Sequence, residues 1–87
     1  MMERYSISVL KSVAKDLRGI PKKDVERILA AIETLAENPR PSGAKKLSGQ
    51  DRYRLRQGRY RILYSIEDAK LVVCIVRVGD RRNVYRS

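Results

Sequence analysis

The stretch that decides the fold runs from Tyr53 to Tyr64 and reads YRLRQGRYRILY. On both sides of Gln57-Gly58, aliphatic and aromatic side chains alternate with arginines. Such alternation over about 4 to 8 residues is typical of a half-buried β-strand, and a short glycine-containing segment between two such runs is typical of a hairpin. The stretch therefore predicts two antiparallel strands with one apolar face and one arginine-rich face.

The sequence that follows this hairpin predicts a third strand. Residues 71–78 are almost wholly apolar and lie beyond a turn at residues 67–70, as expected for a central strand with both faces covered. Cys74 falls inside this run and is expected to be a small core residue, and Gly79 is expected to end the strand. Together with the hairpin, this strand completes a three-stranded meander.

The N-terminal half predicts one strand and two helices. Residues 5–9 alternate apolar and polar side chains, as a half-buried strand does, and residues 11–17 place their apolar side chains on one helical face. Gly19 and Pro21 break this first helix, and Pro21 suits the start of the next one. In residues 22–38 the apolar positions recur at three- and four-residue steps, which predicts a long amphipathic helix.

These elements predict a single α+β domain over residues 1–87. Its N-terminal strand and two-helix hairpin would pack on one face of an antiparallel sheet that the three-stranded meander completes. The other face of the sheet would be open. Five arginines share one parity within their strands and most are expected to project from this open face: Arg52, Arg54, Arg56, Arg59 and Arg61.

The charge of the chain is concentrated in one segment. The formal net charge is +10, and residues 40–61 hold eight basic side chains against one acidic side chain. A solvated strand face normally mixes signs, whereas arginines packed this closely repel one another unless an anion lies between them. The planar fork of the guanidinium matches phosphate oxygens, which favours nucleic acid over an acidic protein or a membrane surface as the partner.

Several function classes are excluded or disfavoured by composition. The chain has one cysteine and no histidine, which removes internal disulfides, Cys/His zinc sites and a histidine general base. The adjacent acids Glu67 and Asp68 lie in a predicted turn without further ligands, so neither a metal nor another cofactor is expected. No apolar run approaches the roughly 18 residues of a membrane span, and no secretory signal pattern opens the chain, so a cytoplasmic protein without membrane contact is expected.

The tyrosines fall into two groups. Tyr53, Tyr60 and Tyr64 occupy alternate strand positions and are expected in the core, although an exposed ring in these positions would be able to stack on a base. Tyr85 lies in the polar tail after Gly79, where no apolar pattern explains it.

Four motifs in order resemble the RelE branch of the RelE/ParE toxin superfamily over nearly the whole chain. They are N-P-R-P at 38–41, K-K-L-S-G at 45–49, YRLRQGRYRILY at 53–64 and V-G-D-R-R-N-V-Y-R at 78–86. The resemblance implies a RelE-like microbial RNase fold and a small toxin of a type II toxin–antitoxin system. Such a toxin enters the ribosomal A site, cleaves the mRNA there without a metal, and is neutralised by a RelB-like antitoxin. Operator DNA would be bound only through the toxin–antitoxin complex.

The resemblance also implies roles for individual residues. Arg61, Arg81 and Tyr85 would be catalytic, the arginines as clamps on the reacting phosphate and the tyrosine in proton transfer or stacking. Arg54 and Arg56 would position the substrate. Further substrate contacts are expected from the remaining basic residues of these segments: Lys45, Lys46, Arg52, Arg59 and Arg82.

The proton acceptor of the reaction is left open by the sequence. Some active relatives have lysines where Arg54 and Arg56 stand, and Gly79-Asp80-Arg81 departs from the G-[HK]-R pattern of the family. Arginine keeps its charge up to a pKa above about 12 and is therefore a poor base. The pKa of Tyr85, ordinarily about 10, would have to be lowered by neighbouring arginines for its hydroxyl to act as one.

Two other functions are compatible with the same scaffold. A ParE-like toxin would inhibit DNA gyrase and cleave nothing, and a non-catalytic nucleic-acid-binding module would need only the basic face. The presence of Arg61, Arg81 and Tyr85 together favours the nuclease, because a purely protein-binding inhibitor has no chemical need for them.

Overall fold

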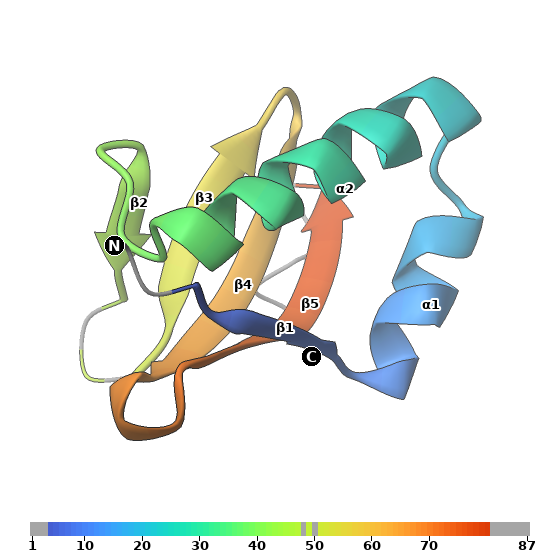
Figure 1. The fold of residues 1–87 in the computed structure, drawn as a ribbon. Coiled ribbons are helices and arrows are strands. Elements are labelled where there is room, and N and C mark those ends of the chain that lie inside the picture. The colour runs from blue at the N-terminus through green and yellow to red at the C-terminus, as the bar shows by residue number, and fades with distance from the viewer. Residues whose placement is uncertain (1–3, 48, 50, 81–87) are drawn as a thin grey trace.

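The computed structural model describes residues 4–47, 49 and 51–80. Its elements, in chain order, are β1 (Ser6–Val9), α1 (Lys11–Arg18), α2 (Lys22–Glu37), β2 (Ala44–Lys46), β3 (Tyr53–Gln57), β4 (Tyr60–Glu67), the 3₁₀ turn η1 (Asp68–Lys70) and β5 (Val72–Asp80). The strands form one sheet in the order β1-β5-β4-β3-β2, across which α2 runs on one side (Figure 1). The predicted α+β class, with two helices on a sheet, is confirmed.

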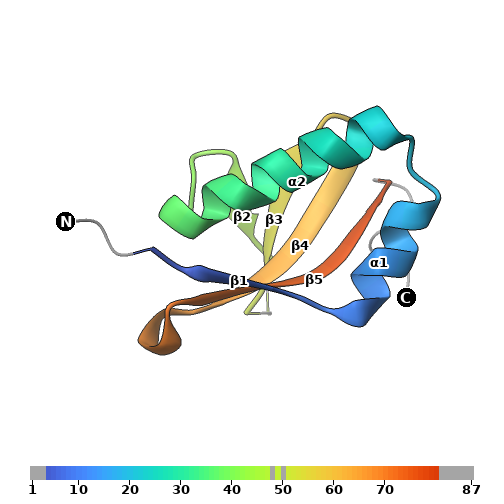
Figure 2. The ribbon, with the colours of Figure 1, turned by 45° about the vertical axis from the view of Figure 1, so that its right-hand side comes forward.

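The two helices lie on the same side of the sheet. The turned view shows α2 above the sheet and α1 beside it on that side, with no helix of the described residues on the other side (Figure 2). The core lies between these layers and joins both helices to the sheet through Val13, Ile28, Ile32, Leu35, Leu55, Tyr60, Ile62, Tyr64, Val73, Ile75 and Val78. Neither helix is long and apolar enough to span a membrane.

The second helix begins and ends close to where its apolar stripe predicts. The Pro21 carbonyl accepts hydrogen bonds from the backbone N–H groups of Asp24 at 2.9 Å and Val25 at 3.0 Å, which start α2. Buried Ile28, Ile32 and Leu35 form the stripe that faces the sheet. The helix ends at Glu37, one residue before the predicted limit.

The sheet is mixed, and the prediction of an antiparallel sheet is wrong for one pair of strands. β1 runs parallel to β5, with Ser6 opposite Val72 and Val9 opposite Ile75. These strands are more than sixty residues apart in the chain, so local alternation carried no information on their relative direction. β2 is a further strand at the opposite edge, antiparallel to β3, and it was not predicted.

The last strand is longer than predicted and has an irregularity. β5 continues through Gly79 to Asp80, so Gly79 does not end it. The register with β4 shifts between Leu63 and Tyr64, because Leu63 lies opposite Arg77 whereas Tyr64 lies opposite Ile75. The extra residue is typical of a β-bulge, and it reverses the parity of β5 between its two ends.

Cys74 is half-buried and lies outside the core cluster, so the prediction of a core residue is corrected. It is opposite Ser65 of β4 and Ser8 of β1, on the face that the helices leave uncovered.

Candidate functional site

The strand register gathers basic side chains on the face opposite the helices. Across the sheet, Lys45 of β2 lies opposite Arg54 of β3, Arg54 opposite Leu63 of β4, and Leu63 opposite Arg77 of β5. Two residues further along β3, Arg56 lies opposite Arg61 of β4. Because residues i and i+2 of a strand share a face, these five cations lie on one side of the sheet. We call them the basic face: Lys45, Arg54, Arg56, Arg61 and Arg77.

Arg61 occupies the most enclosed position of the basic face. It is only 8% exposed, and no described residue accepts a hydrogen bond from its buried Nε. A buried donor without an acceptor is costly, of the order of 1–3 kcal/mol, and is therefore uncommon unless a ligand supplies the acceptor. An anion with hydrogen-bond-accepting oxygens would satisfy both the charge and the unpaired N–H.

Gly79 lies directly opposite Arg61 on the neighbouring strand. It has no side chain, so no side chain of β5 lies directly beside Arg61 at this position of the register. A glycine inside a strand often marks a place where a ligand or another backbone approaches closely.

On the uncovered face of the described strands, acidic side chains are remote from Arg61, because Asp80 lies opposite Tyr60 on the helical side. On the uncovered face, alternation along β4 places Glu67 six residues beyond Arg61, about 20 Å along the strand. Glu67 is paired there with Lys70, whose Nζ lies 3.5 Å from its Oε2. The central part of the basic face is therefore uniformly positive, which favours a polyanionic ligand.

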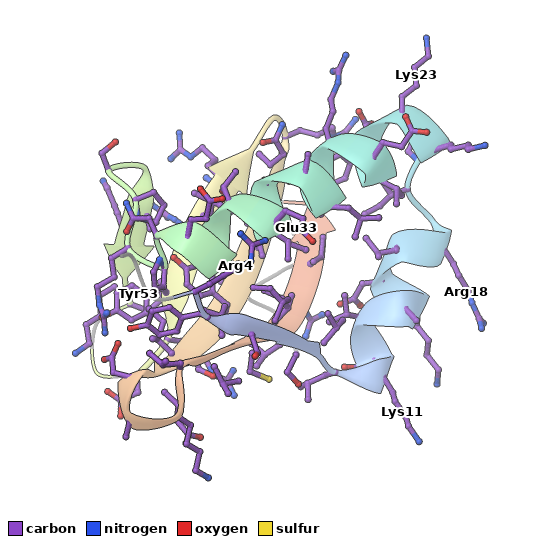
Figure 3. The ribbon with its side chains drawn as sticks, in the orientation of Figure 1. Arg4, Lys11, Arg18, Lys23, Glu33 and Tyr53 are labelled. Carbon is purple, nitrogen blue, oxygen red and sulfur yellow. The ribbon has the colours of Figure 1, made fainter. Side chains whose placement is uncertain are left out.

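Charges on the helical side are more evenly mixed. Arg4 forms ion pairs with Glu33 at 3.2 Å and Glu37 at 3.1 Å. Figure 3 shows Arg4 reaching toward Glu33. The side chains of Lys11, Arg18 and Lys23 point away from the helices in the same view. The contrast between the two sides gives the molecule one distinctly basic surface.

One predicted contact residue, Arg59, lies away from the basic face. It stands in the turn between β3 and β4, and its Nε and Nη2 donate hydrogen bonds of 2.9 and 2.7 Å to Asp80 Oδ2. Its guanidinium carbon lies 5.8 Å from the centre of the Tyr60 ring. Since Tyr60 belongs to the core, Arg59 is on the helical side of the sheet. The prediction that Arg59 projects from the open face is therefore wrong, because turn residues do not follow the alternation of a strand.

Of two further predicted contact residues, Lys46 is placed elsewhere, whereas the face of Arg52 stays a prediction. Lys46 lies opposite Tyr53, which packs against the core, so Lys46 is on the helical side, with its Nζ 3.9 Å from Asp51 Oδ1. Arg52 is exposed and precedes β3, outside the paired strand.

The three strand tyrosines pack on the helical side, as predicted. Tyr64 is fully buried and Tyr60 is 8% exposed, while the Tyr53 ring stacks on that of Tyr64 with centroids 5.7 Å apart. Burial raises the pKa of Tyr64 to about 12, and it also raises the pKa of Tyr60, with the Asp24 carboxylate adding to the effect. The hydroxyls of Tyr60 and Tyr64 are therefore neither exposed on the basic face nor disposed to lose a proton.

Sequence reasoning missed Arg77, which stands in the apolar run of β5. The bulge next to it breaks the alternation of the strand, and only the register with Leu63 reveals its face. The predicted residues Arg81, Arg82 and Tyr85 lie outside the residues that the structure describes.

Comparisons with known proteins agree with one another. A family model described as the ParE toxin of a type II toxin–antitoxin system, parDE, matches residues 7–85. The chain is 32% identical over 90 residues to the toxin RelG of Mycobacterium tuberculosis, which covers 94% of this chain and 97% of that toxin.

Solved structures share the fold over most of the chain. A crystal structure of the archaeal RelE–RelB complex from Pyrococcus horikoshii superimposes with a TM-score of 0.81 and 31% identity, covering 97% of this chain and all of that one. The intact RelBE toxin–antitoxin complex of Escherichia coli superimposes with a TM-score of 0.74 and 29% identity, covering 87% of this chain and 95% of that one.

Proposed function

The chain belongs to the RelE/ParE superfamily of type II toxins, and from this premise we propose that it is an endoribonuclease that cleaves mRNA in the ribosomal A site. The observation that carries the proposal is Arg61. It is a nearly buried arginine whose Nε has no hydrogen-bond acceptor among the described residues, set in a face of five cations. This arrangement suits a phosphodiester, whose non-bridging oxygens accept hydrogen bonds and whose charge offsets the repulsion among the cations.

The reaction we propose is attack of a ribose 2′-hydroxyl on the adjacent phosphorus. The 2′-oxygen forms a new bond to phosphorus as its proton leaves, and the bond from phosphorus to the 5′-oxygen breaks as that oxygen receives a proton. The products are a 2′,3′-cyclic phosphate and a 5′-hydroxyl. Arg61 would stabilise the charge that grows on the non-bridging oxygens, with Arg81 as a second clamp. Arg54 and Arg56 would hold the substrate for in-line attack.

Proton transfer is assigned to Tyr85 in this proposal. Among the described strand residues near Arg61, the basic face offers arginines and a lysine but neither a carboxylate nor a tyrosine. Tyr60 and Tyr64 are held in the core on the other side of the sheet. Tyr85 would act either as a proton carrier or as a stacking partner for the nucleotide, and as a base it would need a pKa lowered by arginines.

An antitoxin is the expected protein partner. The similar Pyrococcus and Escherichia toxins were solved in complex with RelB. We propose that this chain is likewise held by a RelB-like antitoxin with an acidic, largely helical segment. Operator DNA would be bound through that complex and not by the toxin alone.

A second candidate function comes from the matching family model, which is named for ParE. A ParE-like chain would inhibit DNA gyrase without cutting nucleic acid. The enclosed Arg61 favours the nuclease. A protein-binding surface does not require a buried arginine that lies opposite a glycine and whose Nε–H finds no acceptor among the described residues.

The test is a reconstituted translation reaction with primer extension on the message, run in parallel with a gyrase supercoiling assay. The wild-type toxin is expected to produce cuts at the A-site codon and to leave supercoiling unchanged. Arg61→Ala is expected to reduce the cleavage rate by about a hundredfold or more, as the loss of a transition-state contact does. Inhibited supercoiling without cuts would establish the ParE-like function, and RNA binding without either effect would leave a binding module.

A further inference from the structure

Arg77 is a cation within an otherwise apolar strand. It is half-buried in β5 between Val76 and Val78, and its guanidinium forms no hydrogen bond or ion pair within the described part of the chain. Partly burying a guanidinium costs solvation free energy, which a fold normally recovers through an acidic partner. Arg77 is therefore expected either to bind an anionic ligand or to contribute to packing.

The register places Arg77 beside the proposed reaction centre. Arg61 lies opposite Gly79, so Arg77, two residues before Gly79, is its diagonal neighbour on β5. Arg54 has the same diagonal relation to Arg61 on β3, because Arg56 is the residue directly opposite. Diagonal neighbours lie about 7–8 Å apart, so Arg61 is flanked by one arginine on each side.

Leu63 stands between the two flanking arginines. It is opposite both Arg54 and Arg77 and is only 5% exposed, although it does not belong to the core under the helices. Strands are about 4.8 Å apart, so Arg54 and Arg77 begin about 10 Å apart with an apolar side chain between them. Cations at this separation can contact different phosphates of one RNA strand.

We propose that Arg77 is a positioning residue that binds the backbone phosphate of the RNA next to the one held by Arg61, on the β5 side. The inference deepens the proposed function and rests on it. An arginine that holds a neighbouring phosphate contributes to binding in the ground state and in the transition state alike. Its loss should therefore raise KM and leave kcat nearly unchanged, unlike the loss of Arg61.

The experiment measures binding of a single-stranded RNA oligonucleotide to the isolated toxin by fluorescence anisotropy at a series of salt concentrations. The variants are Arg77→Met, Arg77→Lys and, as the matched control, Arg18→Met, because Arg18 is exposed on α1 and points away from the sheet (Figure 3). Arg77→Met is expected to weaken binding about tenfold and to reduce the slope of log K against log salt by about 0.7. Arg77→Lys should keep most of the slope, and Arg18→Met should keep all of it.

Kinetics on programmed ribosomes complete the test. Arg77→Met is expected to raise KM about tenfold, with kcat within about threefold of wild type. Circular dichroism and thermal melting check that the variants fold, and Arg77→Gln replaces Arg77→Met if that variant does not.

The outcomes separate this inference from the proposed function. A wild-type salt slope and KM for folded Arg77→Met would overturn the phosphate contact while leaving the endonuclease intact, and so would a defect confined to antitoxin binding. If the wild-type toxin does not cut programmed ribosomes, the proposed function fails. An Arg77-dependent salt slope would then still establish the RNA contact.

Discussion

At the scale of single residues, Tyr64 shows how a strand position of the YRLRQGRYRILY stretch anchors the loop after α2. Its side chain is fully buried, and its hydroxyl donates a hydrogen bond of 2.7 Å to the Pro39 carbonyl. Tyr64→Phe removes the donor and leaves a buried acceptor, so the free energy of unfolding is expected to fall by about 1–2 kcal/mol. Urea denaturation measures it. Tyr60→Phe is the control, because the hydroxyl of Tyr60 lies 3.4 Å from Asp24 Oδ2 and its loss should cost less than about 0.5 kcal/mol.

A second residue-scale prediction separates the two roles proposed for Tyr85. Tyr85→Phe keeps the ring and removes only the hydroxyl, whereas Tyr85→Ala removes both. Loss of cleavage in both variants is the expected result if the hydroxyl transfers a proton, and loss in Tyr85→Ala alone is expected if the ring only stacks. Cleavage on programmed ribosomes is the measurement. Full activity of both variants would show that Tyr85 has no part in the reaction, and the resemblance to RelE would then mislead at this position.

The residues of the basic face show how far sequence reasoning reaches at this scale. Arg54, Arg56 and Arg61 were found because they obey the alternation of a regular hairpin, and the register confirms that they share a face. Arg59 was misplaced because the turn rotates it onto Asp80. Arg77 was missed because a bulge shifts the parity of its strand, and no one-dimensional pattern locates a bulge in an apolar run.

At the scale of elements, one charged cluster joins four segments that are distant in the chain. Arg40, in the loop after α2, donates two hydrogen bonds to the Asp68 carboxylate in η1, at 3.1 and 2.9 Å. It also donates one of 3.1 Å to the Tyr53 hydroxyl in β3. Tyr5 lies just before β1, and its hydroxyl donates a hydrogen bond of 2.6 Å to Asp68 Oδ1. The cluster therefore ties the loop after α2 to β3 and, through Asp68 of η1, to the segment before β1.

This cluster predicts a specific loss of stability in acid. The hydrogen bonds from Arg40 and Tyr5 lower the pKa of Asp68 to about 2, against about 3.9 in an unfolded chain. A carboxyl with a lowered pKa stabilises the fold above its unfolded pKa, and the contribution is lost as the pH falls through the folded pKa. Asp68→Asn is expected to melt below wild type at pH 7, and the difference should shrink between pH 4 and pH 2.

Thermal melting of both proteins from pH 7 to pH 2 measures the effect. The matched control is Asp51→Asn, because that carboxylate is fully exposed and lies 3.9 Å from Lys46 Nζ. A constant difference between Asp68→Asn and wild type across the range would show that the ionisation of Asp68 does not contribute.

The elements that the sequence predicted are those whose information is local. The apolar stripe of α2 and the hairpin of β3 and β4 depend on neighbours within a few residues, and both were located to within about one residue. β2 has three residues and forms only because β3 offers its edge, so its own sequence carried little signal. The parallel pairing of β1 with β5 depends on the whole topology, which alternation does not encode.

At the scale of the whole molecule, the position of the charge matters more than its sum. The molecule measures 37 × 29 × 25 Å, which is several times the Debye length of about 8 Å at physiological salt. The field of the basic face is therefore local and weakly felt on the helical side, where acids and bases are mixed. A partner that approaches the basic face meets a positive surface, and one that approaches the helices does not.

This asymmetry predicts how an antitoxin finds its toxin. We expect its acidic segment to cover or distort the basic face, so that the association rate falls at least tenfold between low salt and about 0.5 M. Two double variants of equal net charge test the location of the effect: Arg54→Gln/Arg56→Gln on the basic face and Arg18→Gln/Lys23→Gln on the helices, whose side chains point outward (Figure 3). Stopped-flow association at several ionic strengths should show a lower rate and a shallower salt dependence for the first pair alone. Equal effects of the two pairs of substitutions on the association rate would mean that only net charge steers the encounter. An association rate independent of salt would point to neutralisation by displacement of the segment that holds Tyr85.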